Sequence, residues 1–134
     1  MTILFKNARL SDNRSVYLSV LDRVISYIGE SRPEGDFDRE IDCHGNLLMS
    51  GLYNTHCHAA MTLFRGYGED MPLDTWLTTR IYPAEDRLTP EKVKAASELA
   101  IAEMLRGGIV SFSDMYFFCD AICIFCTLLT PSTG

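Results

Sequence analysis

The sequence has few basic residues, and it has no uninterrupted apolar run long enough to cross a membrane. Its 12 lysine and arginine residues are outnumbered by 18 aspartate and glutamate residues, which gives a formal net charge of -6. Such a chain has no broad cationic surface for a nucleic-acid backbone or an anionic bilayer. The most apolar stretch, residues 115–129, is interrupted by Asp120 and falls short of the roughly 20 residues that span a bilayer. We therefore expect no nucleic-acid partner and no membrane partner.

The features of a secreted protein are also missing. Lys6, Arg9 and Asp12 interrupt the apolar residues at the N-terminus, so no stretch there has the pattern of a signal peptide. The five cysteines are odd in number and three of them cluster near the C-terminus, unlike the even framework of a disulfide-stapled domain. We expect reduced thiols and a cytoplasmic protein.

Residues 1–50 have the pattern of short strands separated by turns. Runs rich in apolar and β-branched residues occur at TILFKNARL, VYLSV and VISYIG, and shorter ones follow at EIDC and LLMS. Turn-forming residues separate these runs at SDN, RPEGD and HGN. The pattern predicts a small antiparallel β-sheet unit over residues 1–50, and it does not indicate the strand order.

From residue 51 the spacing of apolar residues lengthens from two to about 3.6. GLYNTHCH predicts a buried strand, PLDTWLTTRIYPAEDRL a helix bent or broken at Pro83, and IVSFSD a second strand. TPEKVKAASELAIAEMLRGG predicts a helix that begins after an N-cap at Thr89 and ends at Gly107 or Gly108. Its apolar side is expected to contain Val93, Ala96, Leu99, Ala100 and Met104. Strand, helices and strand in this order predict a βαβ unit with parallel strands.

Two of the three histidines stand one residue apart, at positions 56 and 58. Side chains alternate along a strand, so His56 and His58 should project to the same side while Cys57 points to the other. Two imidazoles in this arrangement could hold a metal ion, and a catalytic ion takes three or more protein ligands. The alternative is two polar side chains at the end of a strand.

A longer stretch around these histidines carries a resemblance to a known family. The run SGLYNTHCHAAMTLFRGYGEDMPLDTWLTTRIYPAED, followed by LAIAEMLRGGIVSFSDMYFF, resembles the amidohydrolase superfamily. Within it, the chain is most similar to the methylthioadenosine and S-adenosylhomocysteine deaminases and the related chlorohydrolases. The resemblance runs from about residue 3 to about residue 122, and it departs from the family pattern at Ser50, where proline is usual.

The resemblance implies an α/β fold that contains the start of a metal-dependent (β/α)8 TIM barrel. Residues 51–122 would form the first βαβ portion of that barrel, after the sheet (composite sandwich) unit of residues 1–50. Residues 123–134 form a tail that departs from the family. The implied fold is incomplete, because a closed barrel needs eight strands.

The resemblance also implies a site for one divalent metal ion, zinc or iron, with His56 and His58 as its first two ligands. In that family the ion activates water for the hydrolytic deamination of adenosine-like nucleosides. Glu85 is implied to bind the ribose hydroxyls and Trp76 to flank the base, so a small nucleoside or heterocycle is the expected partner. The alternatives are a solvated carboxylate paired with Arg80 or Arg87, and a tryptophan of the helix core.

The rest of the family's metal and catalytic set is not present in this sequence. No histidine follows His58, and His44 lies in a predicted turn. Asp114 ends the second predicted strand, and we do not assign it as a ligand. We therefore expect an N-terminal portion of an enzyme that, expressed alone, shows negligible turnover and weak metal retention. The sequence indicates no oligomeric state.

Two further hypotheses belong to other classes. Cys119, Cys123 and Cys126 have the spacing C-x3-C-x2-C, which resembles a radical S-adenosylmethionine motif whose thiolates hold a [4Fe-4S] cluster. Alternatively, the chain is a stub without chemistry, whose exposed strand edges associate with another copy or with a full-length relative.

Overall fold

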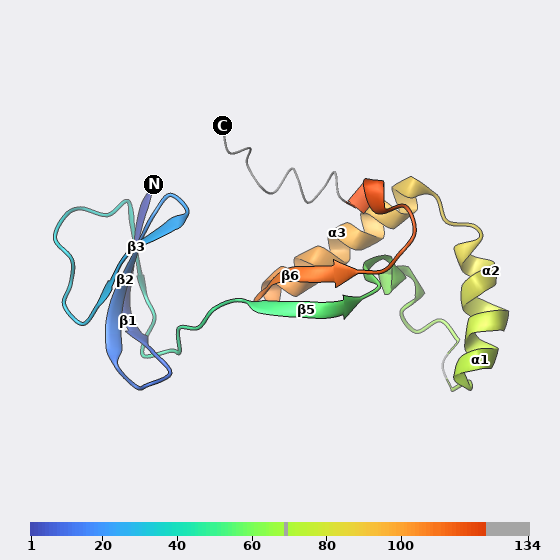
Figure 1. Cartoon of the computed structure of the whole chain (residues 1–134), viewed down its shortest axis with the longest axis horizontal. Helices are drawn as coiled ribbons and strands as arrows, with labels where there is room; N and C mark the ends of the chain where they lie inside the picture. The colour runs from blue at the N-terminus through green and yellow to red at the C-terminus, as the bar shows by residue number, and fades with distance from the viewer. Residues whose placement is uncertain (69, 123–134) are drawn as a thin grey trace. The chain divides into compact units, whose positions relative to one another are not determined.

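A computed structural model describes residues 1–68 and 70–122 of the chain (Figure 1). The chain divides into two compact units after Ser50: unit 1 is Met1–Ser50, and unit 2 begins at Gly51. Within the described residues, no helix has the length and apolar character needed to span a membrane.

Unit 1 is a four-stranded sheet with the strand order β3-β2-β1-β4. Its strands are β1 (Thr2–Arg9), β2 (Ser15–Leu21), β3 (Val24–Gly29) and β4 (Arg39–Asp42). β2 pairs antiparallel with both β1 and β3, whereas β4 pairs parallel with β1. The sheet is therefore mixed, and the prediction of an antiparallel sheet is wrong at β4.

The parallel pairing of β4 follows from how the chain returns to β1. A short hairpin would have placed β4 antiparallel to β3, but residues 30–38 form a longer connection that carries the chain back to the start of β1. There the Asp38 carboxylate accepts hydrogen bonds from the Thr2 backbone N–H at 2.6 Å and the Thr2 hydroxyl at 3.1 Å. The predicted strand at residues 47–50 is reduced to one bridge, between Leu47 and Arg9.

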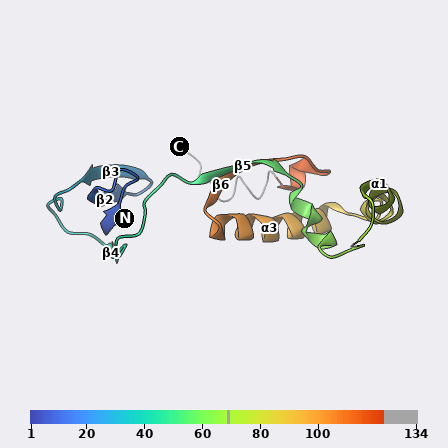
Figure 2. The ribbon, with the colours of Figure 1, turned by 90° about the horizontal axis from the view of Figure 1, so that it is seen from below.

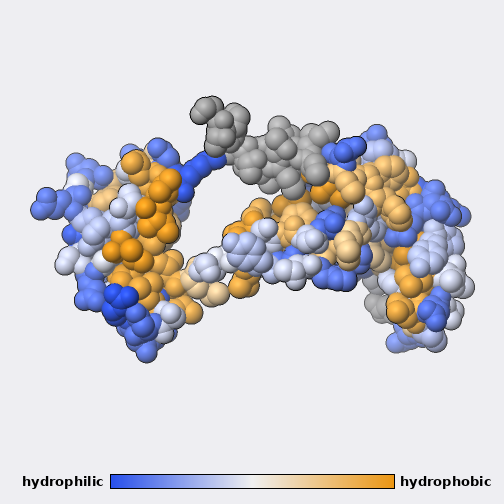
Figure 3. Space-filling view, viewed as in Figure 1, coloured by the Kyte–Doolittle hydropathy of each residue, from blue (hydrophilic) through white to orange (hydrophobic). Residues whose placement is uncertain are grey.

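The core of unit 1 is small. Its buried apolar side chains come from β1 and β2 and are those of Leu4, Ala8, Val16 and Leu18. Other large apolar side chains of the sheet are exposed, and Figure 3 shows the apolar surface of this unit. These exposed residues lie on β2 and β3: Leu21, Val24, Ile25 and Ile28.

Unit 2 is built on two strands, β5 (Leu52–Cys57) and β6 (Ile109–Asp114), which pair in parallel. The helix α3 (Pro90–Arg106) precedes β6 and lies along one face of the pair (Figures 1 and 2). The parallel pairing predicted for these strands is confirmed. β5 is more exposed than predicted, because within the described residues it has β6 as its one neighbouring strand and α3 covers one face.

The helix α3 begins and ends as its sequence predicts. The Thr89 side chain accepts a hydrogen bond from the Lys92 backbone N–H, and Gly108 has a φ of 79°, a left-handed conformation that favours glycine. The buried stripe consists of Val93, Ala96, Ser97, Ala100 and Ile101. Leu99 is 51% exposed, because its position on the helix faces away from this stripe.

Between β5 and α3 lie a 3-10 helix, η1 (Ala59–Phe64), and a longer helical segment. The segment comprises α1 (Leu73–Trp76), a π-helical turn η2 (Leu77–Ile81) and α2 (Tyr82–Glu85). The backbone stays helical through Pro83, so of the predicted bend or break the break is absent. The wider π turn lies immediately before α2, where it can relieve the crowding that proline causes one turn earlier.

Candidate active site

The two histidines lie where β5 ends. His56 is within β5, and His58 stands between β5 and η1. Their ring centroids are 5.2 Å apart and their planes are inclined by 86°. Both residues are exposed. The imidazoles therefore lie side by side at the carboxyl end of the strand, as side-chain alternation predicts.

The orientation of the His58 ring is set by Met115, the residue after β6. Its Nδ1 lies 2.7 Å from the Met115 carbonyl oxygen, immediately after β6. A carbonyl only accepts hydrogen bonds, so this contact places a proton on Nδ1 and leaves Nε2 of the neutral ring as a lone-pair donor. Metal-binding histidines commonly have their second nitrogen held in this way.

A second contact between the two strand ends involves Asp114. Its Oδ1 accepts a hydrogen bond of 2.9 Å from the Ala59 backbone N–H, directly after His58. Its Oδ2 is buried and has no hydrogen-bond partner among the described residues. Burial, reinforced by the Asp114 carboxylate, raises the pKa of the Cys57 thiol. Cys57 is therefore a protonated thiol at neutral pH and a poor nucleophile.

Glu85, at the end of α2, faces the same pocket as His58. Its Oε1 accepts a hydrogen bond of 2.8 Å from the Tyr116 hydroxyl, which comes from the segment after β6. Burial, followed by the hydrogen bond to Glu85, raises the pKa of the Tyr116 phenol, so this group is a proton donor at neutral pH. The structure records no ion pair of Glu85 with Arg80 or Arg87.

The pocket shared by His58 and Glu85 has a volume of about 340 Å³. Its remaining walls are mostly apolar and aromatic, and they consist of Met61, Leu77, Ile81, Tyr82, Met115, Tyr116 and Phe117. Such a site, with a few polar groups that converge in an apolar cavity, is the usual form of a small-molecule pocket.

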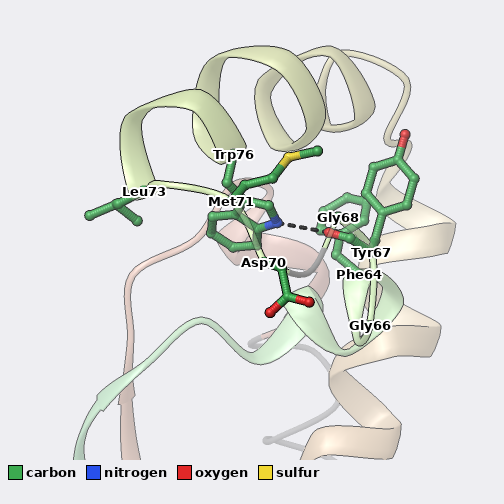
Figure 4. Close-up of a pocket in the computed structure, with 8 residues that line it drawn as sticks. All are labelled: Phe64, Gly66, Tyr67, Gly68, Asp70, Met71, Leu73 and Trp76. Carbon is green, nitrogen blue, oxygen red and sulfur yellow. Dashed lines mark hydrogen bonds between the residues drawn. The ribbon is translucent and has the colours of Figure 1, made fainter.

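Trp76 lies in a different pocket. Its indole N–H donates a hydrogen bond of 2.7 Å to the Tyr67 carbonyl (Figure 4). The ring also packs on Gly68, where an added Cβ would lie 3.1 Å from the indole Cδ1, and Gly68 has a φ of 80°. Figure 4 shows this pocket, which Phe64 and Met71 help to line. Trp76 thus anchors the loop before α1, and its role beside a base stays a prediction.

Sequence reasoning did not single out Tyr116. The signal available was its place, because side chains just after parallel strands meet at one edge of the sheet and His58 and Tyr116 follow neighbouring strands. Their ring centroids are 6.5 Å apart. The partner of Tyr116, Glu85, is 31 residues away in the sequence and belongs to another element.

The histidine pair fits two ligands of a metal ion, because the rings are adjacent and His58 presents Nε2. Within residues 1–68 and 70–122, no three histidine, cysteine, aspartate or glutamate side chains converge as a metal site would require. His44 lies in unit 1, with Nδ1 3.5 Å from the Asp42 carboxylate.

The [4Fe-4S] hypothesis gains no support from the described residues. Cys119 is exposed, and its thiol donates to the Tyr116 carbonyl at 3.2 Å. Cys123 and Cys126 lie outside the part of the chain that the structure describes, as does the tail of residues 123–134.

Comparison with known proteins identifies a family that the sequence matches. Residues 47–124 match the model of the Amidohydrolase family. The 5-methylthioadenosine/S-adenosylhomocysteine deaminase of Syntrophomonas wolfei is 46% identical over 107 residues, which cover 79% of this chain and 25% of that protein. The 5'-deoxyadenosine deaminase of Methanosarcina mazei is 46% identical over 125 residues, which cover 88% of this chain and 29% of that protein.

Solved structures resemble most of the chain. An adenosine deaminase from Xanthomonas campestris with bound zinc superposes with a TM-score of 0.81 at 31% identity, over 95% of this chain and 31% of that one. An atrazine chlorohydrolase from Arthrobacter aurescens, complexed with zinc, superposes with a TM-score of 0.78 at 21% identity, over 95% of this chain and 33% of that one. At that identity the second likeness concerns the fold alone. The chain spans about a quarter of the length of the curated relatives it matches.

Proposed function

The chain belongs to the amidohydrolase family, and we propose that it supplies the first two metal ligands and part of the substrate pocket of a hydrolytic deaminase of adenosine-like nucleosides. The names of the Syntrophomonas and Methanosarcina relatives support this reaction and a substrate such as 5-methylthioadenosine. Because the chain spans about a quarter of those proteins, the activity is proposed for the whole protein. A cytoplasmic location stays a prediction.

One observation carries this proposal: an imidazole whose Nε2 has no hydrogen-bond partner in the described part of the chain and a carboxylate held by a phenol line the same pocket. His58 would bind the metal there together with His56. Glu85 would accept hydrogen bonds from the vicinal hydroxyls of a ribose, since charge-assisted bonds to a carboxylate are strong and a diol supplies two donors. The apolar walls would exclude water from the nucleoside.

The metal is proposed to be zinc or iron. Zinc is supported by the ion bound in the Xanthomonas enzyme and by the two adjacent imidazoles of this chain. When bound, such an ion lowers the pKa of a water molecule enough to supply hydroxide near neutral pH. The contribution of this chain is to orient His58 through the Met115 carbonyl and to hold the nucleoside through Glu85.

A chimera tests the proposal. Residues 1–122 of this chain replace the matching segment of the Syntrophomonas deaminase, so that the remaining three quarters of that enzyme complete the site. We expect the zinc-loaded chimera to release ammonia from 5-methylthioadenosine. A folded chimera that contains zinc and releases no ammonia would contradict the proposal. A second chimera that exchanges residues 51–122 alone separates a misfit of unit 1 from a failure of the site.

A further inference from the structure

We propose that Tyr116 is a positioning residue: with the adjacent Met115 carbonyl it holds Glu85 and His58 in a set relation, and thereby sets selectivity for substrates with a vicinal diol. The inference deepens the proposed function and rests on its assignment of Glu85 to the ribose hydroxyls.

Two neighbouring residues hold the two polar ends of the pocket. The Met115 carbonyl binds His58 Nδ1 at 2.7 Å, and the Tyr116 hydroxyl donates to Glu85 Oε1 at 2.8 Å. The Met115 backbone N–H in turn donates to the Cys57 carbonyl at 3.0 Å, which ties the segment to the end of β5. His58 and Glu85 belong to different elements, so this segment links them directly.

The Tyr116 ring is itself held in place. It packs against a core cluster of Ala60, Val93, Ala96 and Ile122. Its centroid lies 5.3 Å from that of Phe117. A ring fixed in this way keeps its hydroxyl at one position, and substitution by phenylalanine would remove the hydroxyl while retaining most of the ring packing.

The hydrogen bond orients Glu85 for a particular kind of ligand. A carboxylate has two oxygens and about four acceptor positions, of which Tyr116 occupies one on Oε1. Within the described residues, no hydrogen bond is recorded to Oε2, so that oxygen and the second position of Oε1 remain for a ligand. The two hydroxyl donors of a vicinal diol match these two carboxylate oxygens. A sugar without the diol could not form these hydrogen bonds.

The first experiment measures nucleoside affinity of the full chain. Chemical-shift titrations compare adenosine with 2',3'-dideoxyadenosine for the unaltered chain, Y116F and the control Y27F. Tyr27 is a matched control, because its hydroxyl also makes one hydrogen bond of 2.8 Å, to the Ser31 carbonyl in unit 1. We expect Y116F to reduce the preference for adenosine about tenfold, as for a bond to a charged group, and to leave dideoxyadenosine affinity unchanged. Y27F should change neither affinity.

The possible outcomes separate this inference from the proposed function. A preference for adenosine that survives in Y116F overturns the positioning role and leaves the proposed function standing. An unaltered chain that binds both nucleosides equally, or neither, counts against the proposed role of Glu85.

A second measurement tests the contact itself and needs no nucleoside. The carboxyl carbon resonance of Glu85, assigned by its loss in Glu85→Gln, should shift in Y116F and stay in place in Y27F. An unchanged Glu85 resonance in Y116F would overturn the inference whatever the affinities.

Discussion

In unit 1 several carboxylates are paired with cations or N–H groups at the surface, whereas unit 2 also contains polar groups that lack such a partner among the described residues or that line a pocket. Arg32 and Glu40 form a bidentate ion pair, and the Thr2 backbone N–H and hydroxyl donate hydrogen bonds to Asp38. In unit 2 the Asp114 Oδ2 is buried without a partner among the described residues, and no hydrogen bond to His58 Nε2 is seen within that part of the chain. Polar groups without a hydrogen-bond partner are typical of functional sites, whereas paired surface groups stabilise the sheet.

The largest difference between the units should appear in catalysis. In the chimera, we expect His58→Ala to lower ammonia release by about two orders of magnitude or more, because losing a residue that merely hydrogen-bonds to a metal ligand costs about 10- to 100-fold and this change removes a proposed ligand itself. His44→Ala is the control in unit 1, where the imidazole is 80% exposed. Ammonia release and zinc content are measured together. Equal losses in the two variants would remove the functional distinction between the units.

The next largest effect concerns the stability of unit 1. Leu4 is fully buried, so Leu4→Ala should lower the free energy of unfolding by about 2–5 kcal/mol. Leu21, which is 50% exposed on the same sheet, is the control, and Leu21→Ala should have a much smaller effect. Urea denaturation followed by resonances of unit 1 measures both. If Leu4→Ala also destabilises the histidine pair, the two units fold together.

A smaller effect should follow acidification. Hydrogen bonds from Thr2 lower the pKa of Asp38, and the Arg32 guanidinium lowers that of Glu40. A lowered folded-state pKa contributes stability that is present above the unfolded value of about 4 and is lost as the pH falls through the folded value. The urea midpoint of unit 1 should therefore fall between pH 5 and pH 3. Asp38→Asn should lessen that fall, and an identical pH profile would contradict the assignment.

Local patterns predicted much of unit 2. The N-cap at Thr89 and the glycine end of α3 each depend on residues close in sequence, and the parallel pairing of β5 with β6 follows from the order strand, helices, strand along the chain. The approach of His56 and His58 follows from side-chain alternation within one strand.

The features that sequence reasoning missed depend on contacts between distant residues. The parallel position of β4 is secured by Asp38 on Thr2, 36 residues apart. The link of Tyr116 to Glu85 joins the segment after β6 to α2, across 31 residues of the sequence. Neither the spacing of apolar residues nor a helix-capping residue indicates such pairings. They can be identified only from the three-dimensional arrangement of the elements.

The central claim is that His56 and His58 bind one metal ion together, and a zinc titration of the full chain tests it most directly. All three histidines of the sequence can be followed through their imidazole nitrogen resonances, and His44 in unit 1 is the internal reference. We predict that the His56 and His58 signals change together at a lower zinc concentration than the His44 signal, and that His58→Ala abolishes the early change at His56. Three histidines that respond alike, or His56 unaffected by the loss of His58, would contradict the claim.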